Sequence, residues 1–156
     1  ILHKQVDVRR VLDDILSSYY FVENFEKISK QVSFQSGAEF YTDEERLRII
    51  LTNAISNSIK FADFHKKEQH IDIRFSNVGS MIKIVIRDNG LGINSKYMSR
   101  VFDIFYRAIN FSEGSGIGLY ILKETLESLD GKVELESKFR EFTEISLYLS
   151  NPNRKN

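Results

Sequence analysis

The sequence contains no cysteine, and its charges cancel, with 22 Lys and Arg residues against 22 Asp and Glu residues. Without cysteine the chain can form neither a disulfide framework nor a thiolate metal site, which fits a reducing compartment. The balanced charge argues against a broad basic surface of the kind that binds nucleic acid non-specifically. No apolar run approaches the length of a membrane span, so we expect no direct insertion of these residues into a bilayer.

What is present suffices for one domain with a substantial core, because the chain has 156 residues and lacks internal repeats, low-complexity tracts and linkers. The chain begins at Ile1 without a methionine, and we interpret it as an excised domain of a longer protein. We expect the folded domain to occupy residues 6–150. The polar residues 151–156 are expected to form a disordered tail.

Apolar periodicity predicts alternating helices and hairpins. Helices are expected at about 7–19, from a capping box at Thr42–Glu45 to about Ala62, from Asn94 or Ser95 to about Phe102, and at 118–129. Strands are expected near 27–35, 39–41, 71–76, 81–86, 133–135 and 142–149. Because no βαβ unit repeats, this order predicts an α+β fold: a two-layer sandwich with a mixed, mostly antiparallel sheet and helices on one face.

The stretch Arg87–Ile93 places an acidic residue and two glycines directly after a buried strand. A buried carboxylate at Asp88 would accept a hydrogen bond from the exocyclic amine of adenine, whereas guanine presents a carbonyl there. Gly90 and Gly92 would let backbone approach the base without a Cβ clash. On this stretch alone, a turn in which Asp88 caps its own loop remains the stronger alternative.

A second glycine run, Gly114–Leu119, precedes a predicted helix. Free N–H groups and the helix dipole at such a start favour anions such as phosphate. The spacing matches neither the dinucleotide fingerprint nor the P-loop, so a flexible linker with a helix start is an equal alternative.

Two asparagines spaced by four, Asn53 and Asn57, share one face of the long predicted helix, and Lys60 projects nearby. An amide oxygen can ligate Mg²⁺ while phosphates supply other ligands. A solvated polar stripe is the alternative for any lone pair of asparagines. Residues 103–115 are expected to form a mobile loop. There, Phe105 could shield a base or anchor the loop, and Arg107 could reach a terminal phosphate or remain solvated.

The motifs Asn53-x-x-x-Asn57-x-x-Lys60-Phe61, Asp88-x-Gly90-x-Gly92-Ile93, Phe102-x-x-Phe105-Tyr106-Arg107 and Gly114-x-Gly116-x-Gly118-Leu119 occur in that order. They resemble the N, first glycine, F and second glycine boxes of the ATP-binding catalytic domain of sensor histidine kinases. The resemblance covers the chain from about Val6 to Ser150. It implies a Bergerat fold, shared with gyrase, the heat-shock chaperone ATPases and MutL, and it implies ATP and Mg²⁺ as cofactors.

The same resemblance implies site roles by matched position. Asn57 is the implied Mg²⁺ ligand, Asp88 the adenine reader, and residues 103–115 the ATP lid, while Asn53, Lys60 and Arg107 are the implied catalytic residues. The implied nucleotide-binding residues are Asn53, Asn57, Lys60, Asp88, Gly90, Gly92, Ile93, Phe105, Gly114, Ser115, Gly116, Ile117, Gly118 and Leu119.

The implied partners are a histidine-bearing dimerisation domain of the same protein and the receiver domain of a response regulator. No His followed by an acidic residue marks a phosphoacceptor here, since His3 precedes Lys4, so residues 1–5 are expected to be a stub of the dimerisation domain. We expect the fragment to be monomeric and cytoplasmic, and the full-length protein to be a homodimer with a membrane anchor left open. Lys138–Glu141 replaces the usual Gly-x-Gly-Thr turn, which puts the geometry of the last hairpin in doubt.

The residue at position 53 distinguishes the hydrolysing ATPases of this fold from the histidine kinases. The ATPase branches usually carry Glu where this chain has Asn53, and an amide cannot act as a general base toward water. The sequence therefore favours phosphoryl transfer to an external histidine, which needs mainly positioning and charge neutralisation. A hydrolysing ATPase of the same fold and a non-catalytic interaction module are the two alternatives.

Overall fold

A computed structural model describes residues 1–103 and 117–152. The elements, in chain order, are β1 (His3–Gln5), α1 (Val8–Ser17), the 3-10 helix η1 (Phe25–Lys27), β2 (Ile28–Phe34), β3 (Tyr41–Asp43), α2 (Glu44–Lys60), β4 (Gln69–Val78), β5 (Met81–Asp88), the 3-10 helix η2 (Ser95–Arg100), α3 (Gly118–Ser128), β6 (Lys132–Lys138) and β7 (Phe142–Ser150).

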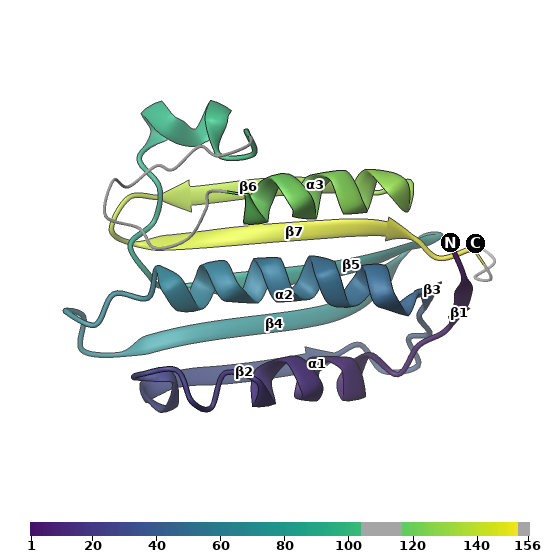
Figure 1. Ribbon diagram of the computed structural model, residues 1–156, viewed down its shortest axis with the longest axis horizontal. Coiled ribbons are helices and arrows are strands. Elements are labelled where there is room, and N and C mark those ends of the chain that lie inside the picture. The colour runs from purple at the N-terminus through teal and green to yellow at the C-terminus, as the bar shows by residue number, and fades with distance from the viewer. Residues whose placement is uncertain (104–116, 153–156) are drawn as a thin grey trace.

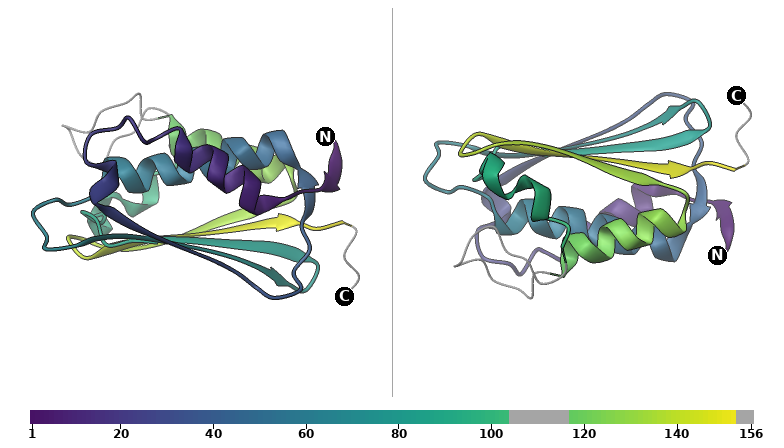
Figure 2. Two further views of the ribbon diagram at one scale, coloured as in Figure 1. Left: turned by 90° about the horizontal axis from the view of Figure 1, so that it is seen from below. Right: turned by 90° about the horizontal axis from the view of Figure 1, so that it is seen from above.

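The main sheet has five strands in the order β2-β4-β5-β7-β6. Only the β2–β4 pair is parallel, and the other three pairs in this sheet are antiparallel. All three α-helices lie on one face of the sheet, as the two views in Figure 2 show. This confirms the predicted two-layer α+β sandwich.

The core lies between the sheet and the helices. The apolar stripe predicted for α2 is buried in full and is made of Leu47, Ile50, Leu51, Ala54, Ile55 and Ile59. It packs over the inner sheet face, where Ile82, Ile84 and Ile86 alternate with the outward residues of β5. Fully burying each such side chain contributes about 1.5–3 kcal/mol, so the position of α2 over the sheet is strongly determined.

Helix α2 begins one residue later than the proposed capping box implies. Asp43 is the N-cap, and its carboxylate accepts a hydrogen bond from the Arg46 N–H at 3.0 Å. The hydroxyl of Thr42 is buried without a hydrogen-bond partner among the described residues. Thr42 belongs instead to β3, which pairs with β1 in a separate two-stranded sheet. The strand predicted at 39–41 is therefore shifted to Tyr41–Asp43.

The start of α2 is held by charge. Glu44 forms ion pairs with Lys4, Arg10 and Arg48 at 2.9–3.0 Å. The hydrogen bonds from Lys4 and Arg48 lower the pKa of Glu44 to about 2. This cluster joins β1 and α1 to the N-terminal end of α2. That end lies at the opposite end of the helix from Lys60 (Figure 1).

The last hairpin forms despite its unusual turn. Glu141 N–H donates to the Lys138 carbonyl at 2.9 Å, and Arg140 takes a left-handed φ of 66° in place of a glycine. β6 and β7 pair over their length. The doubt raised by Lys138–Glu141 is thus resolved in favour of an ordinary hairpin.

The ends of the domain are tied to the body. His3–Gln5, within the predicted stub, forms β1. Asn151, the first residue of the predicted tail, is fully buried, and its side chain bonds Tyr41 N–H and the Glu39 carbonyl. Residues 153–156 lie outside the described residues. Among the helices of the described part, none is long and apolar enough to cross a bilayer.

Candidate functional site

Asp88 is a carboxylate placed in a row of isoleucines. Along β5, Ile82, Ile84, Ile86 and Asp88 share one face of the strand, because side chains alternate with a period of two. This is the inner face, under the helices, and Asp88 is only 7% exposed. A charged group at such a position needs partners, so its surroundings define what it can bind.

Two donors of the protein reach the Asp88 carboxylate. The Gly90 N–H donates to Oδ1 at 2.9 Å, and the Ser58 hydroxyl of α2 also hydrogen-bonds the carboxylate. Burial raises the pKa of Asp88 to about 6, and the bonds from Gly90 and Ser58 oppose that rise. A carboxylate has about four acceptor sites. Asp88 can therefore accept a further hydrogen bond from a ligand.

The loop after Asp88 needs glycine for a reason that sequence reasoning did not give, in addition to the untested one of approach to a base. A Cβ on Gly90 would overlap the Phe61 carbonyl oxygen, and a Cβ on Gly92 would overlap that of Lys138. Gly92 also has a φ of +66°, which L side chains rarely adopt. The close approach that these glycines allow is thus to the chain's own backbone, at the end of α2 and at the β6–β7 turn.

The same loop is held by hydrogen bonds from both sides. Leu91 N–H donates to the Phe61 carbonyl at 2.9 Å, and Ile93 N–H donates to the Ser137 hydroxyl at 2.7 Å. The ammonium of Lys66 bonds carbonyls of the loop as well. Gly90, Gly92 and Ile93 therefore form one fixed unit with Asp88.

The predicted polar face of α2 lies next to this unit. Asn57 directly precedes Ser58, and its half-buried side chain has no hydrogen-bond partner among residues 1–103 and 117–152. Asn53, one turn earlier, uses its amide N–H to bond the Ile49 carbonyl at 2.8 Å. Its Oδ1 remains to accept. Lys60 is exposed at the end of the helix.

Helix α3 begins beside Asn53. A Cβ on Gly118 would lie 3.1 Å from Asn53 Oδ1, so the start of α3 lies against the Asn53 side chain, and a side chain at residue 118 would crowd that amide. Ile117 is the N-cap, and none of the described side chains caps this helix start. The first N–H groups of a helix have no intrahelical acceptor, and together with the helix dipole they favour an anion. Ile117, Gly118 and Leu119 thus place a helix start, the kind of position that favours anions, beside the asparagine face.

The geometry joins three of the predicted parts. Asp88 contacts α2 through Ser58, and Gly118 lies against Asn53 of the same helix, so α2 connects both neighbours. Figure 1 shows the ends of α2 and β5 and the start of α3 at the same end of the molecule. Outside the described residues lie all but the first residue of the predicted lid at 103–115, and with it Phe105, Arg107, Gly114, Ser115 and Gly116.

The donor set fits a metal that takes most of its ligands from elsewhere. No group of three His, Cys, Asp or Glu side chains in the described ranges could hold a metal ion. The free amide of Asn57 is a single oxygen ligand of the hard type that Mg²⁺ accepts. This arrangement fits an ion brought in with phosphates better than a protein-made metal cage.

Sequence reasoning missed three residues of this region: Ser58, Lys66 and Ser137. Ser58 sits within the asparagine motif, and its burial at 2% could have been anticipated from its spacing with Ala54 and Ile55 on the apolar stripe. The link of Lys66 and Ser137 to this loop has no local signal, because the carbonyls that Lys66 binds lie 23 to 75 residues away and the Ile93 N–H that Ser137 accepts from lies 44 residues away.

Comparisons with known proteins agree with this geometry. The family model described as "Histidine kinase-, DNA gyrase B-, and HSP90-like ATPase" matches residues 42–153. The chain is 29% identical over 121 residues to a probable C4-dicarboxylate sensor kinase of Bacillus subtilis, covering 77% of this chain and 22% of that protein. It is 30% identical over 143 residues to the autoinducer 1 sensor kinase/phosphatase LuxN of Vibrio campbellii, covering 90% of this chain and 16% of LuxN.

The fold is similar to that of full-length ShkA, solved in complex with AMPPNP, with a TM-score of 0.81 and 21% identity over 96% of this chain and 31% of ShkA. The chain spans about a fifth of the length of these two curated relatives. Because the family match covers most of the chain, the chain belongs to the family of histidine kinase-, DNA gyrase B- and HSP90-like ATPases, as an ATP-binding catalytic domain of the sensor histidine kinase type.

Proposed function

We propose that the domain binds ATP with Mg²⁺ across α2 and transfers the γ-phosphate to a histidine on a dimerisation domain of the same protein. The observation that carries the proposal is the position of two unlike polar regions beside one helix. We call Ser58, Lys66, Asp88 and residues 89–93 the base end. We call Asn53, Asn57, Lys60 and residues 117–119 the phosphate end.

At the base end, the buried Asp88 carboxylate would accept the exocyclic amine of adenine. The Gly90 N–H and the Ser58 hydroxyl hold the carboxylate in place. Guanine would present a carbonyl oxygen to this acceptor, and the two would repel. The base end thus supports a preference for adenine nucleotides.

At the phosphate end, the N–H groups at the start of α3 and the Lys60 ammonium supply positive potential for phosphate oxygens. Asn57 would ligate Mg²⁺ through its free amide oxygen. When bound, Mg²⁺ would neutralise part of the phosphate charge. Arg107 is proposed to reach a terminal phosphate and the glycines at 114 and 116 to meet the phosphates, while Phe105 is proposed to shield the base; all four lie outside the described residues.

Transfer is favoured over hydrolysis because residue 53 is an amide. Asn53 Oδ1 lies beside Gly118, and an amide there cannot take a proton from water. A histidine delivered from outside needs only to be aligned with the γ-phosphate. The proposed partners are therefore the histidine-bearing dimerisation domain and, downstream, a response regulator receiver domain.

The wider setting follows from these partners. In the whole protein we propose a homodimer, since the acceptor domain is a dimerisation domain, with this domain in the cytoplasm where ATP is available. Residues 1–5 would connect toward the acceptor domain through β1. Isolated, the domain is expected to be monomeric.

The test compares this chain alone with a full-length protein that contains it, each incubated with γ-labelled ATP and Mg²⁺. The full-length protein should label an acid-labile phosphohistidine, whereas this chain alone should bind nucleotide but label itself little. Asn57→Ala should abolish labelling of the full-length protein, and the matched helix variant Thr52→Ala, at an exposed position of α2, should not. Steady phosphate release without labelling would instead support a hydrolysing ATPase.

A further inference from the structure

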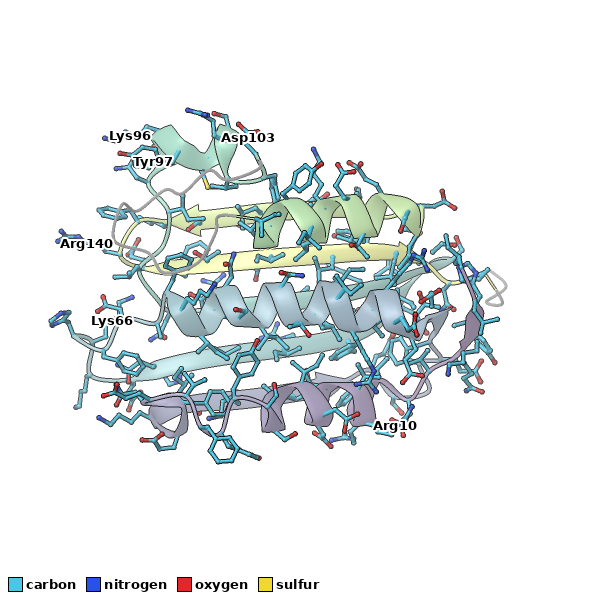
Figure 3. All side chains as sticks on the ribbon, in the orientation of Figure 1. Arg10, Lys66, Lys96, Tyr97, Asp103 and Arg140 are labelled. Carbon is cyan, nitrogen blue, oxygen red and sulfur yellow. The ribbon has the colours of Figure 1, made fainter. Side chains whose placement is uncertain are left out.

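Lys66 lies in the connection between α2 and β4, and its ammonium contacts three backbone carbonyls. It donates to the carbonyl of Asn89, to that of Gly90 at 3.1 Å and to that of Glu141 at 3.1 Å. A lysine ammonium has three N–H donors and no acceptor, so each donor has a partner from the protein. Figure 3 labels Lys66 at the end of the molecule where Arg140 and the last hairpin turn also lie.

Two of these carbonyls belong to the loop that follows Asp88. β5 ends at Asp88, so the carbonyls of Asn89 and Gly90 leave the sheet ladder and need hydrogen-bond donors elsewhere. The side chain of Asn89 is fixed on the opposite side by the His70 N–H at 2.7 Å and the Glu68 carbonyl at 2.9 Å. Lys66 therefore adds a second set of hydrogen bonds to a loop that the Asn89 side chain already connects to Glu68 and His70.

The third carbonyl belongs to the turn between β6 and β7. That turn also meets the loop through the Arg140 N–H, which donates to the Leu91 carbonyl, and through the contact of Gly92 with Lys138. The Lys66 ammonium thus binds loop and turn at once. Its stem starts from the residues just beyond α2, so one side chain connects three separate segments of the chain.

The charge of Lys66 acts on the neighbouring carboxylate as well. Burial raises the pKa of Asp88, and the positive charges of Lys66 and Arg87 are among the groups that oppose the rise. Lys66 therefore stabilises the ionised form of the acceptor in addition to holding the loop behind it.

We propose that Lys66 is a positioning residue for the base end: it holds residues 89–92 against the β6–β7 turn, and so keeps the Asp88 carboxylate and the Gly90 N–H in the geometry that distinguishes adenine from guanine. This inference rests on the proposed function, and it assigns a specificity role to a lysine outside the four motifs.

The experiment measures ATP and GTP affinity by calorimetry, with Mg²⁺ present, for the wild type, Lys66→Met, Lys66→Arg and Lys67→Met. Lys66→Met keeps most of the side-chain volume and removes the charge and the donors. Because the variant removes three hydrogen bonds from a charged donor to the loop and the turn, we expect the preference for ATP over GTP to fall by about tenfold or more. Lys67→Met is the matched control, because Lys67 is the adjacent exposed lysine, and it should keep the preference.

The preference is a ratio measured within one variant, so partial unfolding lowers both affinities and leaves it unchanged. Lys66→Arg retains the charge and several donors and should restore part of the preference. Full ATP preference in Lys66→Met would overturn this inference and leave the proposed function standing. A wild-type chain that binds no nucleotide, or binds ATP and GTP equally, would overturn the proposed reading of adenine and the role of Lys66 with it.

Discussion

The base end and the phosphate end differ in how far the protein satisfies its own polar groups. At the base end, the N–H groups of Gly90, Leu91 and Ile93 donate to Asp88, the Phe61 carbonyl and Ser137, respectively, at 2.7–2.9 Å. At the phosphate end, Asn57 has no partner within the described residues and no described side chain caps α3. Within the described residues, the protein satisfies most polar groups of the base end itself, whereas the phosphate end has an amide and helix N–H groups without protein partners.

The difference indicates how specificity and charge are divided. A loop fixed by many bonds before the ligand arrives loses little entropy on binding, so it can discriminate one base from another by shape. Free amide and N–H groups can follow phosphates and a metal ion whose positions change during transfer. If the proposed function holds, rigidity at the base end and unsatisfied groups at the phosphate end would suit a domain that holds adenine and releases a phosphoryl group.

The largest expected effect breaks the rigid end directly. Gly92→Ala places a Cβ into the Lys138 carbonyl at a φ of +66°, and we expect a loss of about 3 kcal/mol in the free energy of unfolding. Gly37→Ala is the matched control, since Gly37 has a similar φ of +73° but nothing within 4 Å of the added Cβ. It should lose only about 1 kcal/mol. Urea unfolding measures both, and equal losses would mean that the loop is not tightly packed.

The next effect separates the two ends by their dependence on the metal. Asp88→Ala should weaken ATP binding by about a hundredfold, with or without Mg²⁺, because it removes a charged acceptor. Asn57→Ala should remove only the gain in affinity that Mg²⁺ provides. Asp72→Ala, on the opposite face of the adjacent strand, is the control for calorimetry. If Asp88→Ala lost only the Mg²⁺-dependent part, the assignment of the ends would be reversed.

A smaller effect follows from pH. The pKa of Asp88 is raised from 3.8 to about 6, so the ionised acceptor is depleted as pH falls from 7.5 to 5, and ATP binding should weaken by about tenfold. Asp88→Asn keeps an acceptor oxygen but does not titrate, so the slope that it retains belongs to the nucleotide. A wild-type slope equal to that of Asp88→Asn would contradict a titrating acceptor at the base end.

The raised pKa of Asp88 also makes the free energy of unfolding depend on pH. Between pH 3.8 and about 6, the folded state holds a proton on Asp88 that the unfolded state has lost. This contribution therefore falls as pH rises through that window. The pKa of Glu44 is lowered from 4.5 to about 2. Its stabilising contribution is therefore present above pH 4.5 and is lost as pH falls from 4.5 toward 2. The difference between wild type and Asp88→Asn isolates the first effect.

The smallest expected effect concerns the β6–β7 turn, which contacts the loop of the base end. Arg140 holds a φ of 66° in the turn that faces Leu91, and Arg140→Gly should raise the free energy of unfolding by about 0.5–1 kcal/mol by removing that strain. Phe139→Gly, at the adjacent exposed position of the same turn, should not stabilise. Thermal unfolding compares the two, and a destabilised Arg140→Gly would show that the arginine side chain matters more than its backbone.

Much of the fold could be predicted because its pattern is local. The spacing of Leu47, Ile50, Leu51 and Ala54 predicts α2 and its buried face, and alternation predicts β4 and β5. β1 could not be predicted, since its three residues are all exposed and have no periodicity. The parallel pairing of β2 with β4 joins residues about 40 apart, and no local pattern specifies it.

The candidate site shows the same division. Asp88 could be proposed from its place at the end of an apolar strand, and Asn53 and Asn57 from their spacing by four, but each pattern alone favoured a structural alternative and only the four motifs together favoured a site. The actual constraint on Gly90 and Gly92 could not be proposed, because it comes from carbonyls of Phe61 and Lys138 in distant parts of the chain. The same holds for Lys66, whose function depends on contacts that only the folded chain creates.

The most direct test follows the backbone amide signals of the isotope-labelled chain by NMR during titration with an ATP analogue and Mg²⁺. A single nucleotide that spans both ends should shift the amides of Gly90 and Leu91 together with those of Gly118 and Leu119, with one shared dissociation constant, and leave Gly37 unchanged. Shifts confined to one of these two groups, or two different dissociation constants, would contradict a single site that extends across α2.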